Sequence, residues 1–301
     1  MNEYVISKSD LKRWCSIPVD ELVNHPDKKM TLRVRDKDAV SREVGNLLAD
    51  EVLENNRLGR PTRWILPGGP AGQYDILTER INRERISMKN VFVFHMDTWL
   101  DWQYRPFPLT NLRFSCQAKM QKLLYDRIDD ELNVPKEQRF FPDPLQPDLF
   151  DETIDKLGGI DTLVGGVGCK GLVAFNEQPA YACYRVSLDE FANSKSRIVT
   201  LREDTILAYG EREFGACFDA LPPNAFTIGM KSMLKAKRAV FVVTTGRWKQ
   251  TVIRVALFSE PTTEYPVTLF PAHVPECILY CDINSADHVI SQKYSDAPIL
   301  T

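Results

Sequence analysis

A chain of 301 residues, of which 44% are apolar and 26% charged, has the composition of a globular protein with a sizeable core. Its formal net charge of −3 gives no electrostatic reason to expect binding to nucleic acid or to an anionic membrane. No apolar run approaches the roughly 18 residues needed to span a bilayer. The first residues, Met1 to Tyr4, lack a cationic segment followed by an apolar one, so no signal peptide is predicted.

The cysteines and histidines form no recognisable framework. There are seven cysteines, an odd number without a Cys-x-x-Cys pair, and four scattered histidines, His25, His95, His273 and His288. This spacing matches neither a set of disulfides nor a metal site. We therefore expect reduced thiols in a cytoplasmic protein that binds no metal and needs no cofactor. A homo-oligomer remains an open alternative.

The chain begins with a polar segment and then alternates between strand and helix patterns. Residues 1–37 are mixed and polar, and we expect them to form an extension before a single α/β domain over residues 38–301. Apolar residues at helical spacing predict a helix over 38–56. A short apolar run predicts the first core strand over 63–66.

Further strands are predicted where apolar and β-branched residues form short runs: 91–96, 162–167, 197–201, 225–228, 239–244 and 277–281. Helical patterns occur between several of them: 74–81, 112–124, 151–157, 203–214 and the segment after Gly246. This alternation favours a Rossmann-like α/β fold, a doubly wound and largely parallel sheet with helices on both faces. Such sheets bind ligands at the carboxyl ends of their strands.

Two glycine-rich segments follow predicted strands. The stretch from Val164 to Pro179 reads V-G-G-V-G-C-K-G-L-V-A-F-N-E-Q-P. Glycine permits positive φ and a close approach of the backbone to a ligand. A strand that leads into such a loop can present N–H groups to an anion, although the pattern alone is more often structural. The second segment, with Gly68 and Gly69, lies between a predicted strand and a predicted helix, which is the arrangement that cradles phosphate.

Four predicted strand ends carry residues suited to a small anionic ligand. These are Gly68 with Gly69, Asp97, the loop from Gly165 to Glu177, and the segment from Gly246 to Lys249. In a doubly wound sheet they would meet at one crevice, which Arg197 could reach from a neighbouring strand. Each residue also has a structural alternative, because aspartates after strands often form turns and single cations are usually solvated.

The glycine-rich stretch resembles the signature loop of the glucosamine-6-phosphate deaminase family, which reads approximately G-G-x-G-x-D-G-H-x-A-F-N-E-P. The glycines and the segment Ala174–Glu177 fit this pattern. The family's aspartate is Lys170 here, and its histidine is Leu172. The resemblance implies the family's fold and places Gly166, Gly168, Lys170 and Leu172 on the substrate loop.

The resemblance covers residues 60–282 and includes a carboxylate. The segment Phe94–Asp97 is similar to the family's F-N-M-D, which implies that Asp97 is the carboxylate that transfers the proton. Glu177 keeps the place of the family's catalytic glutamate.

Two cations also fall on family positions. The segment Ser196–Leu201 resembles T-R-I-x-T-L, and Gly246–Lys249 resembles G-x-x-K. This implies that Arg197 and Lys249 bind the substrate's phosphate. The family's phosphate loop L-P-T-G-G-T-P corresponds to Leu66–Pro70, which keeps both glycines and lacks both threonines.

The resemblance implies aldose–ketose isomerisation of a hexosamine or hexose phosphate, with loss of ammonia to give fructose 6-phosphate. Asp97 would move a proton between C2 and C1. The family's histidine opens the sugar ring, and leucine at position 172 has no proton to exchange. We therefore expect impaired or altered ring opening, unless His95, Cys169 or Lys170 supplies the missing group.

Two other functions stay open. One is a catalytically inactive protein that binds or senses sugar phosphates. The other is a 6-phosphogluconolactonase-like hydrolase, which has the same fold. Residues 1–60 offer no basic recognition helix, so a DNA-binding regulator is not expected.

Overall fold

The computed structural model describes residues 4–180 and 185–292. Its centre is a seven-stranded sheet of order β1-β10-β9-β6-β2-β3-β5, in which every paired neighbour is parallel. The prediction of a largely parallel α/β sheet is confirmed. The strands are β1 (Thr31–Val34), β2 (Thr62–Leu66), β3 (Val91–His95), β5 (Arg139–Phe140), β6 (Ile160–Gly165), β9 (Ala236–Val243) and β10 (Glu276–Cys281).

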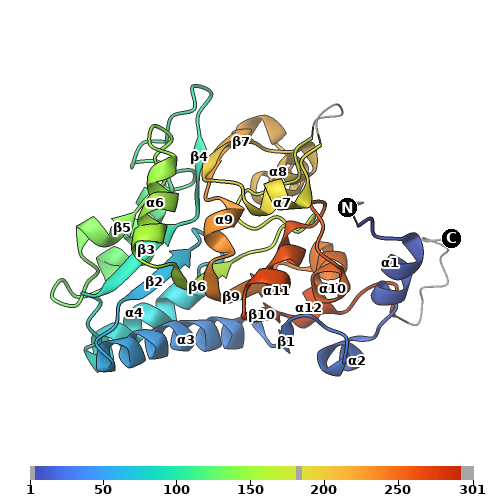
Figure 1. Cartoon of the computed structure of the whole chain (residues 1–301), viewed down its shortest axis with the longest axis horizontal. Coiled ribbons are helices and arrows are strands. Elements are labelled where there is room, and N and C mark those ends of the chain that lie inside the picture. The colour runs from blue at the N-terminus through green and yellow to red at the C-terminus, as the bar shows by residue number, and fades with distance from the viewer. Residues whose placement is uncertain (1–3, 181–184, 293–301) are drawn as a thin grey trace.

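Helices cover both faces of this sheet (Figure 1). One face carries α3 (Lys37–Arg57), α4 (Gly72–Glu84) and α5 (Cys116–Leu123). The other carries α1 (Lys8–Cys15), α2 (Val19–Asn24), α6 (Asp148–Lys156), α7 (Leu188–Ala192), α9 (Met230–Met233), α10 (Gln250–Phe258), α11 (Phe270–His273) and α12 (Ile283–Ala286). Within the described ranges, no helix has the length and apolar character needed to cross a membrane.

The two helical layers enclose two separate cores, and β9 shows why. Val240 and Val242 pack into the core beneath α3 and α4, whereas Ala239, Phe241 and Val243 pack into the core on the other face. Successive side chains of a strand point to opposite faces, so a strand buried on both faces reads as one apolar run. That run is the pattern that predicts this strand.

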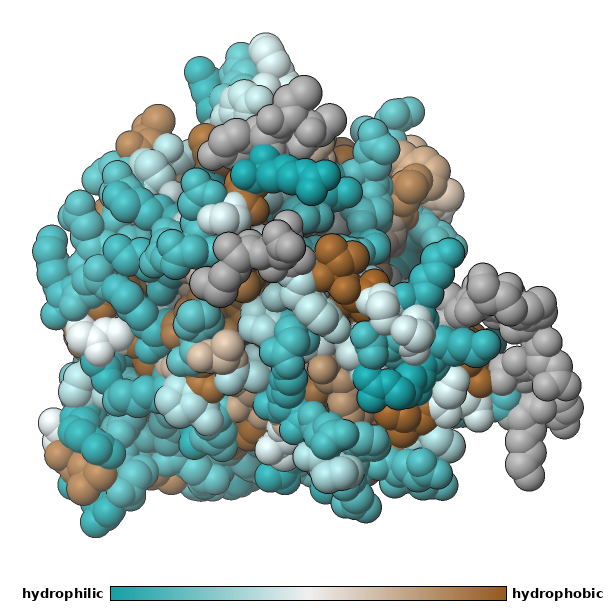
Figure 2. All heavy atoms as spheres, turned by 45° about the vertical axis from the view of Figure 1, so that its right-hand side comes forward, coloured by the Kyte–Doolittle hydropathy of each residue, from teal (hydrophilic) through white to brown (hydrophobic). Residues whose placement is uncertain are grey.

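The outer surface agrees with this burial. The face seen in Figure 2 is mostly hydrophilic, and its apolar side chains occur in small separate groups. Scattered apolar residues of this kind are normal for a soluble domain.

A second, antiparallel sheet differs from the predicted topology. Its order is β4 (Asp97–Leu100), β8 (Asn224–Thr227) and β7 (Arg197–Thr200). The sequence indicates strands at β7 and β8, but apolar patterning does not reveal that they leave the main sheet. With α8 (Glu203–Phe214), they form a small unit at the top of the view in Figure 1, while α3 runs along the bottom.

The main sheet begins inside the segment 1–37, for which the sequence predicts an extension. Its edge strand β1 pairs with β10 from Thr31 to Val34. Arg254 is fully buried and donates hydrogen bonds to the carbonyl oxygens of Ile17 and Ala286. The N-terminal segment is therefore joined to the sheet and to the end of the described chain.

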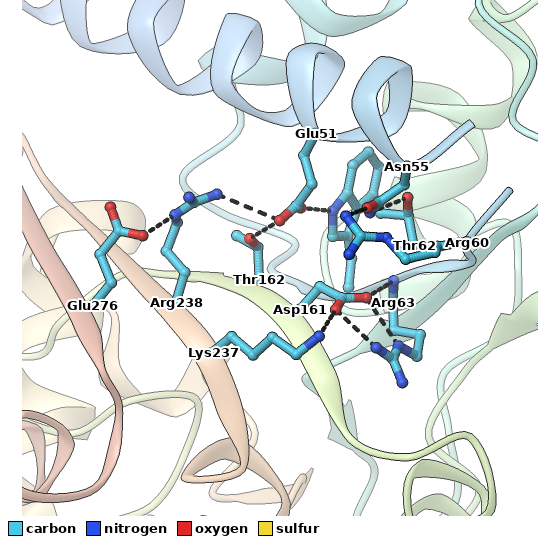
Figure 3. Close-up of polar contacts among 11 residues, drawn as sticks. Glu51, Asn55, Arg60, Thr62, Arg63, Asp161, Thr162, Lys237, Arg238 and Glu276 are labelled. Carbon is cyan, nitrogen blue, oxygen red and sulfur yellow. Dashed lines mark hydrogen bonds and ion pairs between the residues drawn. The ribbon is translucent and has the colours of Figure 1, made fainter. Parts of the chain in front are cut away.

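An ionic network ties together the amino ends of the strands, at the edge opposite their carboxyl ends (Figure 3). Asp161 of β6 accepts two hydrogen bonds from the Arg63 guanidinium, at 2.8 and 2.9 Å, and one from Lys237 at 2.8 Å. The side chains of Asp161 and Arg63 are only 9% and 12% exposed. Nearby, Glu51 of α3 accepts a hydrogen bond from Thr162 at 2.8 Å. Side chains from β2, β6, β9 and α3 are thus held in one register.

We expect Asp161→Ala to lower the free energy of unfolding by about 3 kcal/mol, because it leaves the largely buried Arg63 guanidinium without its carboxylate. Urea denaturation at pH 7 measures this loss. Asp148→Ala is the matched control, because Asp148 pairs with Lys195 at side-chain exposures of 58% and 60%. An equal loss in the two variants would contradict the assignment of the network as a stabilising element.

Candidate active site

A cavity of about 680 Å³ lies at the carboxyl ends of four neighbouring strands. Gly68 follows β2, Asp97 follows β3, Gly166 follows β6 and Thr245 follows β9, and all four residues line the cavity. Residues of α5, α8 and β4 close it from the other side. The expectation that these strand ends converge is therefore met.

The structure brings most of the predicted site residues to this cavity and leaves three outside its lining. Those that line it are Gly68, Gly69, Asp97, Gly166, Gly168, Leu172 and Lys249. Lys170, Glu177 and Arg197 do not line it. A more open hollow of about 700 Å³ lies beside α3, among the charged groups at the amino ends of the strands. None of the predicted site residues lines that hollow.

Two carboxylates line the cavity, Asp97 and the exposed Glu213, and Asp97 is the one that lies at a strand end. It is half-buried at the start of β4, and its side chain makes no hydrogen bond or ion pair with the described part of the chain. Burial raises the pKa of Asp97 to about 7, although the nearby Lys119 acts in the opposite direction. A free carboxyl group with a pKa close to neutrality is suited to accept and return a proton.

Lys249 is the buried cation of the cavity. It lies between Trp248 and α10, where its Nζ donates a hydrogen bond to the carbonyl oxygen of Val167 and lies 3.7 Å from the centre of the Trp248 ring. Burial lowers the pKa of Lys249 to about 7; Cys169 opposes this shift and Arg212 adds to it. A bound anion would reverse the shift, since an opposite charge favours the ammonium form.

The substrate loop after β6 forms a tight turn. The N–H of Gly168 donates to the carbonyl oxygen of Leu172, and the N–H of Gly171 donates to that of Gly168, both at 2.9 Å. Gly171 has φ of 74°, and a Cβ there would lie 2.9 Å from the Cα of Tyr265. Glycine is therefore required at 171. The turn places the Leu172 side chain on the cavity wall.

Lys170 and Glu177 do not pair with each other. The Nζ of Lys170 pairs with Glu264 at 3.2 Å, and its side chain is 48% exposed. Glu177 instead lies at the N-terminus of α8, where it accepts hydrogen bonds from the backbone N–H of Arg202 at 2.8 Å and from the hydroxyl of Thr205. Thr205 lines the cavity, so Glu177 is one hydrogen bond removed from it.

Arg197 does not line the cavity, and one strand of the small sheet separates it from Asp97. Asp97 pairs with Thr227, which pairs with Arg197, so the three side chains lie in one row on one face. Two strand spacings separate the ends of the row by about 10 Å. The hydroxyl of Thr227 in the middle accepts a hydrogen bond from the N–H of Phe175 at 3.1 Å. The Arg197 guanidinium donates to the carbonyl oxygen of Lys195 instead.

Of the three residues considered for ring opening, one lines the cavity. His95 is fully buried, bonded through Nε2 to the Tyr125 hydroxyl at 2.8 Å and stacked on Phe141. Burial lowers its pKa to about 3. Lys170 is turned towards Glu264, whereas Cys169 lines the cavity as a half-buried free thiol.

Sequence reasoning missed the residues that close the cavity on the helical side. Thr205, Tyr209 and Arg212 of α8 line it at spacings of four and three residues, which put them on one helix face. The helical spacing of these three residues is visible in the sequence, but only the tertiary structure shows that this face of α8 covers the cavity. Lys119 of α5 and Arg113 gave no signal at all, because isolated cations in a helical region are usually solvated.

The parallel sheet with a cavity at the carboxyl ends of its strands defines the chain as an α/β protein of the kind that binds ligands at this edge. No family model matches the chain. A curated glucosamine-6-phosphate deaminase from Porphyromonas gingivalis is 30% identical over 243 residues, which are 78% of this chain and 85% of that protein. Another, from Thermoanaerobacter pseudethanolicus, is 25% identical over 87% of this chain and 95% of its own length. The chain belongs to the glucosamine-6-phosphate deaminase family.

Solved structures agree on the fold. A monomeric glucosamine-6-phosphate deaminase of the NagB superfamily has a TM-score of 0.70 at 20% identity, covering 85% of this chain and 98% of that one. A 6-phosphogluconolactonase from Trypanosoma cruzi has a TM-score of 0.61 at 15% identity, covering 88% and 98%.

The pKa of Asp97 predicts how its removal changes stability. In the folded state the pKa of Asp97 is about 7, whereas its ordinary pKa, which applies to the unfolded chain, is 3.8. Between these two pH values the unfolded chain releases the proton and the folded protein keeps it. The free energy of unfolding of the wild type therefore falls, relative to that of Asp97→Asn, as pH rises through this range. At pH 8 we expect Asp97→Asn to be more stable than wild type by about 1–2 kcal/mol, allowing for water in the cavity. At pH 4 the difference should vanish.

Denaturant unfolding across this pH range measures the effect. Asp219→Asn changes an exposed carboxylate and serves as the control. A difference between wild type and Asp97→Asn that does not vary with pH would contradict the raised pKa.

Proposed function

We propose that this chain binds a hexosamine or hexose phosphate in the cavity and interconverts aldose and ketose forms through Asp97. The observation that carries this proposal is the pairing, in one cavity, of an unengaged strand-end carboxylate with the buried Lys249. The names of the curated relatives support the amino sugar as substrate.

The phosphate end of the substrate would lie at Lys249 and the adjoining glycine loops. A phosphomonoester carries nearly two negative charges, and each charge-assisted hydrogen bond to it is worth about 1.5–3 kcal/mol. Because burial keeps Lys249 partly neutral near pH 7, binding would draw a proton onto its amine. The N–H groups of the loops at Gly68 and Gly166 supply further donors.

The sugar's first two carbons would lie beside Asp97. In an open-chain amino sugar, the carboxylate removes the proton from C2 to give an enolamine and returns that proton to C1. The resulting imine at C2 reacts with water, which releases ammonia and leaves fructose 6-phosphate. A pKa of about 7 keeps a usable fraction of Asp97 ionised at neutral pH while leaving its acid form able to donate.

In the family a histidine opens the sugar ring, and none of the four histidines of this chain lines the cavity. Leu172 lines it instead. General acid–base assistance is typically worth about 10²–10⁴-fold. The chain would therefore act on open-chain substrate, or open the ring slowly through another group such as Cys169.

The same observation favours one alternative, a protein that binds sugar phosphates without turnover. It would keep Lys249 and the glycine loops and lose ammonia release. Hydrolysis of the 6-phosphogluconolactonase type has less support, because the structural neighbours of that name share only the fold.

Lys249→Met should weaken binding of fructose 6-phosphate at least 30-fold, because it removes the buried ammonium from the phosphate end; this corresponds to about 2 kcal/mol. Arg197→Met should change binding less than threefold, because its guanidinium does not line the cavity. Isothermal titration calorimetry measures both variants. Full binding by Lys249→Met, or loss of binding by Arg197→Met alone, would overturn the assignment of the phosphate end.

Wild-type ammonia release from glucosamine 6-phosphate should be slow, and Leu172→His with Lys170→Asp should raise it at least tenfold by supplying a ring-opening imidazole and its carboxylate partner. A coupled ammonia assay gives the rate, and Leu172→Gln is the control for polarity alone. A fast wild type would show that the histidine is dispensable here. No turnover in either protein, with binding intact, would favour the sensing alternative.

A further inference from the structure

We propose that Lys119 is a further substrate-binding residue, whose ammonium meets the anionic end of the sugar phosphate above the Gly68–Gly69 loop. This inference rests on the proposed function and adds a residue to it that the family signature does not contain. The N–H groups of Lys119 would take the place of the two threonine hydroxyls that the Leu66–Pro70 loop lacks.

The position of Lys119 is fixed by the start of α5. Ser115 caps this helix by accepting a hydrogen bond from the N–H of Ala118 at 3.3 Å, and the N–H of Cys116 donates to the Thr98 hydroxyl at 3.3 Å. The second contact joins α5 to β4, one residue from Asp97. The Lys119 stem then extends over the glycine loop, where its Cδ would lie 3.5 Å from a methyl group added to Gly68.

The N–H groups of the Lys119 ammonium have no hydrogen-bond partner in the described part of the chain. Lys119 is half-buried and lines the cavity, and its side chain forms neither a hydrogen bond nor an ion pair with residues 4–180 or 185–292. Asp97 is close enough for Lys119 to influence its ionisation, yet the two groups form no ion pair. A lysine ammonium can donate three hydrogen bonds. A half-buried ammonium without a protein partner is therefore available to a ligand in the space between them.

The glycine loop connects Lys119 with Lys249. Pro70 packs against Gly166, where an added methyl would lie 3.3 Å from the Pro70 Cδ. The next residue, Val167, accepts the hydrogen bond of Lys249. Lys119 therefore lies beside Gly68, and Lys249 contacts the neighbouring Gly166–Val167 segment from the start of α10. An anion over the loop would be contacted by cations from two directions, which suits a group with several charged oxygens.

Lys119 also favours the ionised form of Asp97, against the larger effect of burial. The titratable groups that interact with Asp97 come from three helices: Tyr74 of α4, Cys116 and Lys119 of α5, and Tyr209 of α8. Lys119 is the cation in this set, while Arg113, Arg212, Glu213 and Lys249 line the remainder of the cavity. Loss of Lys119 would let burial raise the pKa of Asp97 further. Binding and proton transfer would thus depend on the same ammonium.

Calorimetric titration of the full chain with fructose 6-phosphate at low salt tests the proposal. We expect Lys119→Met to weaken binding at least tenfold, Lys119→Arg to recover most of it, and Lys122→Met to leave it within twofold. Lys122 lies on the exposed side of the same helix and is the matched control. If Lys119→Met does not fold, Lys119→Gln takes its place.

A second readout separates a binding role from a structural one. In the Lys119→Met background, the upper limit of the pH range in which Asp97→Asn gains stability should move upward, because that limit follows the pKa of Asp97 in the folded state. Wild-type binding that is unchanged in Lys119→Met, or an unmoved pH range, would overturn the assignment of Lys119 and leave the proposed function intact. A wild type that binds no sugar phosphate would overturn both.

Discussion

Parallel pairing of the seven central strands is the constraint on which the site depends. Because β2, β3, β6 and β9 all run in one direction, the segments that follow them reach the same edge of the sheet. The opposite edge is tied by the Asp161 and Glu51 networks, which join β2, β6, β9 and α3. A shift of one strand by a single residue would exchange its buried faces and also displace its contribution to the cavity.

Burial in this cavity brings the pKa values of a carboxyl group and an amine close to each other. It raises the pKa of Asp97 and lowers that of Lys249, each to about 7. Neither group is neutralised by a strong protein partner, in contrast to Asp161, whose carboxylate is held by Arg63 and Lys237. Charged groups are therefore paired in the network at the amino ends of the strands, whereas Asp97 and Lys249 in the cavity have no ion-pair partner among the described residues.

The departures from the family loop also have a structural consequence. Lys170 pairs with Glu264 outside the cavity lining, so the charge change at 170 adds no cation to the cavity wall. Glu177 retains a role as the acceptor at the start of α8 and reaches the cavity through Thr205. Only Leu172 changes the cavity wall itself, from a side chain that exchanges protons in the family to an apolar one.

The amino-acid sequence alone determined the parallel α/β class and the meeting of several strand ends at one edge of the sheet, because both follow from apolar periodicity and from the alternation of strands and helices. Seven residues that line the cavity were also named from the sequence, and for most of them the resemblance to the family, not the local pattern, supplied the role. The sequence did not determine the antiparallel unit of β4, β8 and β7, because short strands look alike in either sheet. Tertiary structure alone decided that Arg197 lies outside the cavity lining and that Lys119 and α8 close the cavity. Those positions depend on packing between segments far apart in the chain, which local pattern does not encode.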